Sequence, residues 1–372
     1  MIAAMTKERS THGTLTEHEL AELRALIETR SGIHFDQSRD RFFSTRVREL
    51  METRGLAHGA ELLRLVRSSN VEYDALLERL LTQETSFLRY PGAFRALERK
   101  VLPQMHARKF WQDPRALRIW SAGCASGEEP YSIALTIAET LEFADAWQVE
   151  ILATDISKEA LKHAEAGVYT RRSLAALQAD QLERHFVRRD GQYHVKPRLR
   201  GMVRFAPMNL AQSVYLGRFD CIFCMNVLIY FSESRRSALI QRFHDYLEPG
   251  GFLFLGHAES VARLPVKFDS FVHDDFILYQ KPAASAQPVP VAQERPRAPP
   301  ARNSSRSSCR KPPSTCSSCG STPASCKTPI PRPATSSGCT SPRTPWAVLP
   351  PCTASRCSPR SPGSWPTSSS TP

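Results

Sequence analysis

The chain has no run of about 18 apolar residues, which is the length that a helix needs to cross a membrane. The segment after Met1 also lacks the apolar core of a secretory signal. Only three of the ten cysteines, Cys124, Cys221 and Cys224, come before residue 283, as is typical of a reduced compartment. We therefore expect a cytoplasmic protein with no membrane insertion.

Acidic residues become rare after residue 282. Residues 283–372 carry 11 Lys and Arg and a single acid, Glu294, whereas residues 1–282 carry 38 basic and 36 acidic residues. The net charge of +12 therefore comes mostly from the C-terminal segment. A nearly neutral body argues against a nucleic-acid partner.

Residues 283–372 are rich in Ser, Pro, Thr, Arg and Cys and have no apolar periodicity. Such a segment cannot bury enough surface to offset its ordering entropy, so we expect a disordered tail, and a flexible N-terminus at 1–13. Cys316 and Cys319 have CxxC spacing without a second ligand pair, so no metal site is expected. The abrupt change also suggests a frameshifted reading, a hypothesis that an intact reading frame in the transcript near codons 283–300 would refute.

Residues 14–90 predict a small helical domain. Thr16 and Glu19 fit a capping box, and apolar residues from Leu20 to Leu81 recur at helical spacing in four segments. Several arginines lie in and just before the second segment, where they form either a solvated face or a docking face: Arg39, Arg41, Arg46 and Arg48.

Residues 91–282 predict an α/β domain. The strand candidates are Leu117–Ser121, Val149–Thr154, Phe219–Cys224, Phe252–Leu255 and Phe276–Tyr279. Helical patterns separate the first four, which implies a mostly parallel sheet buried on both faces. Residues 166–207 interrupt this pattern: Asp190–Gly191 predicts a hairpin turn, and Met202–Phe205 suggests a third strand of a small antiparallel insertion.

The segment Leu117–Ser132 contains a strand, a turn with Gly123 and Gly127, paired acids at Glu128 and Glu129, and the start of a helix. Glycines allow the backbone to approach a ligand closely. The acids would repel a pyrophosphate but suit a ligand with hydroxyl groups and positive charge. S-adenosylmethionine (SAM), with its sulfonium and amino groups, is such a ligand.

Polar residues follow other predicted strands. Asp155 can accept hydrogen bonds from ribose hydroxyls or cap the helix that begins near Ile156. Asn226 can contact a ligand or start the next helix. Asn209 can form hydrogen bonds with the edge of an adenine ring or stabilise a turn of the backbone.

Three further groups allow two interpretations. Arg89 can hold a carboxylate through paired hydrogen bonds or form an interdomain salt bridge. His257 and Glu259 suggest acid–base chemistry, but a loop His and Glu beside a strand are more often structural. Cys221 and Cys224 lie on an apolar strand and are expected in the core.

Together these residues resemble the chemotaxis receptor methyltransferase family, CheR, over about residues 14–282. The blocks that carry the resemblance are Gln83–Arg89, Ser121–Ser132, Ala153–Ile156, Cys224–Phe231, Leu247–Gly251 and Gly256–Glu259. The resemblance implies a Rossmann-like SAM-methyltransferase sheet with a small helical N-terminal domain and an inserted antiparallel β-subdomain. It also implies a monomer that methylates glutamate side chains on the cytoplasmic helices of methyl-accepting chemoreceptors.

The resemblance implies cofactor contacts at Gln83, Thr85, Arg89, Glu128, Asp155, Asn209, Leu210, Met225 and Asn226. Gln83 replaces the usual Asn, and Met225 stands where Arg is common. No catalytic base is expected, because a glutamate with a pKa of about 4.3 is already an ionised nucleophile and needs only alignment. Arg89 is the candidate catalytic residue. The resemblance also favours the docking interpretation of the four N-terminal arginines, as a surface that contacts the receptor.

The short turn Arg189–Gln192 resembles the family members that need no tether to the receptor C-terminus. Two alternatives stay open. One is a SAM-binding sensor without turnover, and the other is a methyltransferase that acts on RNA or a small molecule.

Overall fold

The computed structural model describes residues 15–262 and 266–283. The expectations for residues 1–13, for the Cys316–Cys319 pair and for the tail after Ala283 lie outside these residues. None of the helices in the described ranges is long and apolar enough to cross a lipid bilayer.

The N-terminal part is helical, as predicted. Its elements are α1 (Glu17–Ser31), η1 (Gln37–Arg39), α2 (Asp40–Arg54), α3 (Gly59–Ser68) and α4 (Asn70–Leu80). The capping box is confirmed: Glu19 Oε2 accepts from the Thr16 N–H at 2.8 Å, and Thr16 Oγ1 accepts from the Glu19 N–H at 3.2 Å. Apolar side chains from all four α-helices form one core, including the fully buried Leu23, Phe43 and Leu76.

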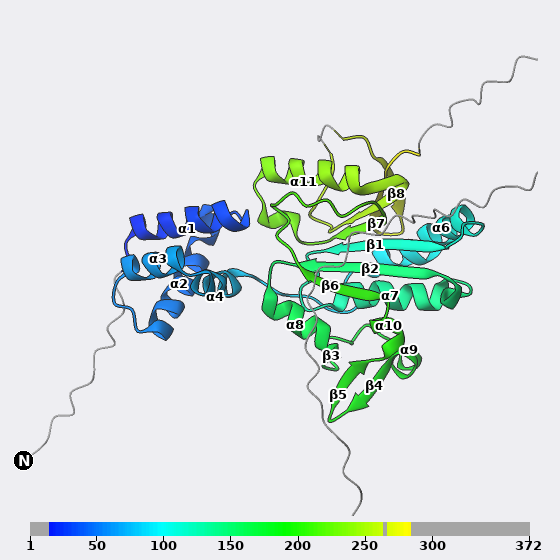
Figure 1. Cartoon of the computed structure of the whole chain (residues 1–372), viewed down its shortest axis with the longest axis horizontal. Helices are drawn as coiled ribbons and strands as arrows, with labels where there is room; N and C mark the ends of the chain where they lie inside the picture. The colour runs from blue at the N-terminus through cyan, green and yellow to red at the C-terminus, as the bar shows by residue number, and fades with distance from the viewer. Residues whose placement is uncertain (1–14, 263–265, 284–372) are drawn as a thin grey trace, which may run out of the picture. The chain divides into compact units, whose positions relative to one another are not determined.

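The second part is built on a seven-stranded sheet (Figure 1). Its strands are β1 (Ala116–Ala122), β2 (Gln148–Asp155), β6 (Val203–Pro207), β7 (Phe219–Cys224), β8 (Leu247–Leu255), β9 (Asp269–His273) and β10 (Phe276–Gln280). The order is β6-β2-β1-β7-β8-β10-β9, and the first five strands are parallel. The predicted α/β class and mostly parallel sheet are confirmed, and β9 is an additional edge strand.

Helices cover both faces of the sheet. Side chains such as Ile119 and Phe223 pack with α5 (Pro91–Ala96), the π-helical turn η2 (Leu97–Val101), α6 (Leu102–Lys109) and α7 (Glu128–Thr140). Alternate residues such as Trp120 and Ile222 pack with α11 (Glu233–Tyr246) on the other face. The remaining helical elements are η3 (Ala144–Ala146), α8 (Lys158–Ala166), α9 (Ala179–His185), α10 (Pro197–Arg200) and η4 (Leu228–Tyr230).

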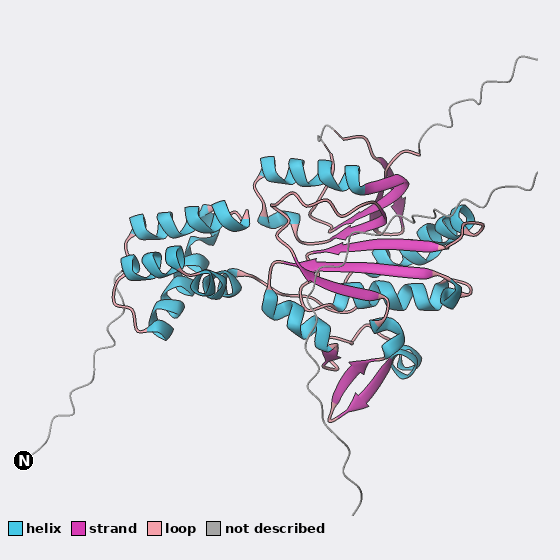
Figure 2. Ribbon diagram, in the orientation of Figure 1, coloured by secondary structure: helices cyan, strands magenta, loops and turns pink. Residues whose placement is uncertain are grey.

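A small antiparallel sheet is inserted between α8 and β6 (Figure 2). It consists of β3 (Val168–Tyr169), β4 (Phe186–Arg189) and β5 (Gln192–Val195). The predicted hairpin is confirmed: Asp190 and Gly191 both have positive φ, 49° and 77°, as a two-residue turn of this kind requires.

The third strand of this insertion is β3, so the assignment of Met202–Phe205 to it was wrong. That segment forms β6, which pairs in parallel with β2 and sets Val203 opposite Ile151. Val203 is buried there, and the Met202 carbonyl accepts from the Ile151 N–H at 2.8 Å. A short strand can pair with any open edge, and here the apolar contact of the main sheet decides which edge it takes.

Candidate functional site

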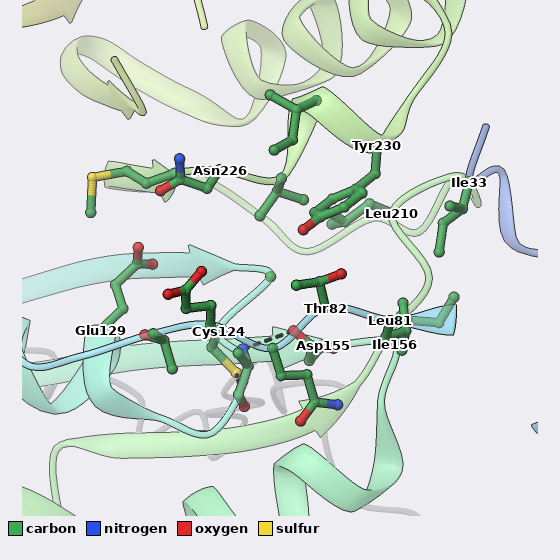
Figure 3. A pocket seen from close by; sticks show the side chains of 18 of the residues that line it. Ile33, Leu81, Thr82, Cys124, Glu129, Asp155, Ile156, Leu210, Asn226 and Tyr230 are labelled. Atoms are coloured by element: carbon green, nitrogen blue, oxygen red, sulfur yellow. Dashed lines mark hydrogen bonds between the residues drawn. The ribbon is translucent and has the colours of Figure 1, made fainter. Parts of the chain in front are cut away.

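A cavity of about 280 Å³ lies beyond the carboxyl ends of the parallel strands (Figure 3). The chain places β2 and β6 on one side of β1 and then β7 and β8 on the other, which leaves a crevice where the order reverses. Eight of the predicted cofactor residues line the cavity: Gln83, Thr85, Arg89, Asp155, Asn209, Leu210, Met225 and Asn226.

Asp155 joins the end of β2 to the turn after β1. One carboxylate oxygen accepts from the Ala125 N–H and the other from the Ser157 N–H, both at 2.8 Å. Burial raises the Asp155 pKa, and these amides oppose the shift. The helix-capping alternative is wrong, because the Ser157 hydroxyl caps α8 by accepting from the Ala160 N–H. The Ile156 N–H also faces this carboxylate, which keeps remaining acceptor capacity for a ligand.

Of the paired acids, the cavity wall contains Glu129 rather than Glu128. Glu128 accepts a hydrogen bond from the Ser126 hydroxyl at 2.7 Å, while Glu129 accepts from the Ser121 hydroxyl at 2.6 Å. Burial raises the pKa of Glu129 to about 7. Successive helix residues point about 100° apart, so a sequence motif with two adjacent acids does not say which one faces a ligand. The role assigned to Glu128 stays a prediction.

Asn226 occupies the left-handed region, with φ of 62°. Glu259 holds this loop by accepting from the N–H groups of Asn226 at 3.0 Å, Leu228 at 2.7 Å and Gly256 at 2.7 Å. The Glu259 side chain therefore has the structural role that the sequence favoured. Tyr90 donates to the Asn226 amide oxygen at 2.7 Å, which leaves the amide nitrogen to donate to a ligand.

Asn209 turns the chain and also contacts the helical domain. Its amide oxygen accepts from the Ala211 N–H at 2.8 Å, and its amide nitrogen donates to the Arg30 carbonyl at 2.9 Å. The turn interpretation is therefore observed, while adenine recognition stays a prediction.

Arg89 donates to the Glu84 carbonyl within its own segment. No carboxylate among the described residues lies within ion-pair distance of it, so the interdomain salt bridge is not formed there. Its positive charge still lowers the pKa of Glu129, against the larger effect of burial. Arg89 thus lies on the cavity wall with unused donor groups.

The helical domain supplies part of the cavity wall, which the sequence did not predict. The His34 N–H donates to the Tyr230 carbonyl at 2.8 Å, and Ile33 pairs with Phe231 as an isolated β-bridge. Ile33 and Tyr230 both line the cavity, and Figure 3 shows the Tyr230 ring beside the same space as Glu129 and Asp155. Tyr230 lies in one of the sequence blocks noted above, but no signal linked Ile33 to them.

The four N-terminal arginines do not share one face. The guanidinium groups of Arg39 and Arg46 lie 5.7 Å and 5.3 Å from the Phe42 ring centre, and Arg39 also lies 5.2 Å from the Tyr230 ring centre. Arg41 and Arg48 are exposed, and their helical positions are two residues out of phase with the first pair. Arg39 therefore touches a residue of the cavity wall, and Arg46 lies on the other side of Phe42, where it pairs with Glu49 at 2.8 Å. Arg41 and Arg48 point elsewhere.

The donor groups around this cavity suit an organic ligand. No group of three or more His, Cys, Asp or Glu side chains that could hold a metal ion occurs among the residues that the structure describes. The cavity instead offers carboxyl oxygens at Asp155 and Glu129, an amide donor at Asn226, and apolar surface at Ile156 and Leu210. This set can bind a ligand that combines hydroxyl groups, a cation and a flat apolar ring.

Two family descriptions match the chain. "CheR methyltransferase, all-alpha domain" matches residues 18–81, and "CheR methyltransferase, SAM binding domain" matches residues 83–277. Together they cover more than half of the chain and agree with the division between helical domain and sheet domain described above.

Curated relatives give the same result. The chain is 35% identical to chemotaxis protein methyltransferase 1 of Pseudomonas aeruginosa, over 69% of this chain and 95% of the relative. It is 36% identical to the chemotaxis protein methyltransferase of Vibrio parahaemolyticus, over 72% of this chain and 98% of the relative. For the Escherichia coli protein of that name the identity is 36%, over 68% of this chain and 88% of the relative.

Glu129 makes a testable contribution to stability. Because its pKa is raised from 4.5 to about 7, the native state binds this proton more tightly than the unfolded state. Its stabilising contribution is therefore complete below pH 4.5 and is lost as the pH rises towards 7. We therefore compare the free energy of unfolding of Glu129→Gln with that of wild type, measured by urea unfolding without ligand. We expect the difference to shift in favour of the variant by about 2–3 kcal/mol from pH 5 to pH 8. Glu142→Gln, an exposed carboxyl beyond the same helix, is the control, and an equal difference at both pH values would contradict the assignment.

Proposed function

This chain belongs to the CheR methyltransferase family and carries its SAM-binding domain, and from this premise we propose that it methylates chemoreceptors. The methyl group passes from SAM to glutamate side chains on the cytoplasmic helices of these receptors and forms glutamyl methyl esters. The protein thereby serves sensory adaptation.

One observation carries this proposal: the cavity has acidic groups inside and cations at its rim. Asp155 and Glu129 line the interior, while Arg89 lies on the wall and Arg39 lies against the Tyr230 ring. Interior acids favour a ligand with hydroxyl and ammonium groups. The outer cations favour an anionic second substrate, such as a glutamate side chain on an acidic helix.

The residues of the cavity fit SAM. Asp155 offers its remaining acceptor capacity to a ribose hydroxyl, and Glu129, once deprotonated, accepts from an ammonium group. Ile156 and Leu210 offer apolar surface to the adenine, and the amide nitrogen of Asn226 donates. When bound, SAM supplies a methyl group on a positively charged sulfur, which a carboxylate oxygen can accept without transfer of a proton.

The side chains of this protein then have only to position the glutamate and exclude water. A glutamate with a pKa of about 4.3 is ionised at neutral pH, so no general base is required. Arg89 has free donor groups for that carboxylate, and Tyr230 forms the adjacent wall. Alignment of this kind contributes on the order of 7–11 kcal/mol to the rate. Since the carboxylate gains the methyl group, its charge is lost and the ester leaves the cationic rim.

Receptor docking is assigned to Arg39, which touches the cavity wall, and to Arg46 beside it. The two flank the partly buried Phe42 ring, so this surface combines positive charge with an aromatic side chain. An amphipathic helix with glutamates can pair with both features. The two-residue turn between β4 and β5 offers little surface for a receptor C-terminal peptide, which supports docking without a tether.

Incubation with labelled SAM and membranes from the source organism tests the proposed reaction. We expect label in receptor-sized protein and its release as methanol by mild base, because glutamyl esters are base-labile. Binding of SAM without transfer would support the sensor alternative, and base-stable label would indicate another acceptor.

Docking can be tested with two pairs of arginines. Arg39→Ala with Arg46→Ala should raise the receptor concentration needed for half-maximal methylation by about fivefold to tenfold, and leave SAM affinity unchanged. Arg41→Ala with Arg48→Ala is the matched control, since it removes the same charge from another face. Equal effects of both pairs, or none from the first, would show that docking occurs elsewhere.

Removal of the receptor's last residues should have little effect on the rate of methylation, because the proposed docking needs no C-terminal tether.

A further inference from the structure

The Ser157 hydroxyl uses its full hydrogen-bonding capacity. It donates to Glu78 Oε2 at 2.6 Å, and it accepts from the Ala160 N–H at 3.0 Å and from Gln83 Nε2 at 2.8 Å. A hydroxyl has one donor and two acceptor positions, so none is left for a ligand. The side chain is fully buried, with an exposed fraction of 0%. Ser157 therefore has no free group with which to contact a ligand itself.

Capping of α8 explains only one of these three contacts. A serine at the start of a helix needs to accept from a backbone N–H, as Ser157 does from Ala160. The other two join separate parts of the chain: Glu78 lies in the last turn of α4, and Gln83 lies in the segment that links the two domains. Glu78 also accepts from the Glu159 N–H at 3.3 Å, so its carboxylate spans the first turn of α8.

The same serine is tied to the cavity at two points. Its backbone N–H donates to Asp155 Oδ1 at 2.8 Å, and its hydroxyl accepts from Gln83. Asp155 and Gln83 both line the cavity. A short chain of hydrogen bonds thus leads from the helical domain, through Ser157, to two residues on the cofactor wall. The amide of Gln83, one methylene longer than the usual Asn, reaches Ser157 in this chain.

We propose that Glu78 is a positioning residue for the cofactor site, acting through Ser157 on Gln83 and Asp155. The helical domain then contributes to SAM binding without touching SAM. The inference rests on the proposed function only in taking Gln83 and Asp155 as cofactor contacts. By thermodynamic linkage, whatever moves α4 changes cofactor affinity, and cofactor binding restrains α4 to the same extent.

A neighbouring ion pair provides a matched control. Lys158 Nζ lies 2.6 Å from Asp74 Oδ2, between the same two helices, and both side chains are substantially exposed. Asp74 makes no contact with Ser157 or with the cavity wall. Asp74→Ala therefore loosens the same domain contact by one carboxylate without breaking the chain of hydrogen bonds.

The experiment measures binding of S-adenosylhomocysteine, the demethylated product, to the full-length chain by calorimetry. We expect Glu78→Ala to weaken binding by about fivefold to tenfold, as for the net loss of one ordinary hydrogen bond, because Glu78 acts on the cofactor site only through Ser157. Glu78→Gln removes the charge but keeps an oxygen that can accept from Ser157, so it should recover most of the affinity. Asp74→Ala should bind like wild type. Glu78→Ala and Ser157→Ala each break the same chain of hydrogen bonds. The double variant, Glu78→Ala with Ser157→Ala, should therefore bind S-adenosylhomocysteine no more weakly than Ser157→Ala alone.

Each result either supports or overturns the proposal that Glu78 positions the cofactor site. Wild-type affinity in Glu78→Ala would overturn the proposal, and so would an equal loss in Asp74→Ala, which would point to general loosening of the domain contact. A loss in Glu78→Gln as large as in Glu78→Ala would assign the effect to charge and overturn the hydrogen-bond route. Melting temperatures of all variants identify any change due to unfolding. Because this measurement needs no receptor, failure of the proposed methyl transfer would leave its result intact.

Discussion

The cavity depends on the parallel register of β1 with its two neighbours. Ala122 lies opposite Thr154 on β2, and Ser121 lies opposite Phe223 on β7, so the strands end at nearly the same level. The backbone then turns sharply, with the Gly123 and Cys124 N–H groups both donating to the Thr154 carbonyl. A slip of one residue would reverse the side chains of a strand and remove the carboxyl groups from this edge.

The general position of the site could be predicted from the sequence, because parallel strands carry their ligand contacts at one edge. Asp155 and Asn226 follow apolar runs, and their place at the cavity required only that those runs be neighbours in one sheet. The hairpin at Asp190–Gly191 was equally accessible, since few residues adopt a positive φ readily. The hairpin depends on local chemistry alone, and the position of the site needs in addition only that the strands lie side by side in one parallel sheet.

Other features depend on contacts between distant segments. Which of two adjacent glutamates faces the cavity is set by the rotation of α7 against the sheet, and Ile33 reaches the cavity only because its backbone pairs with Phe231. The strand β6 joined the main sheet rather than the insertion for a similar reason, because burial of Val203 beside Ile151 decided between two open edges. No periodicity or motif encodes such pairings.

The two sides of the cavity also differ in how they are held. Glu259 fixes the loop after β7 with hydrogen bonds from three backbone N–H groups, and it is itself 8% exposed. The opposite side is completed by contacts between the two domains, such as the Asn209 side chain with the Arg30 carbonyl and the His34 N–H with the Tyr230 carbonyl. Three N–H groups on one buried carboxylate are lost only when the loop unfolds, whereas these separate contacts can open one at a time, so movement that admits substrates is expected on the side of the helical domain.

The left-handed backbone of Asn226 limits how this position can vary during evolution. With φ at 62°, it admits glycine, asparagine and aspartate at low steric cost. Glycine would leave the Tyr90 hydroxyl without its acceptor, and aspartate would add a third carboxylate beside Glu129 and Glu259. Backbone geometry and local charge thus converge on one amino acid, and functional homologues are expected to retain asparagine here or to change Tyr90 together with it.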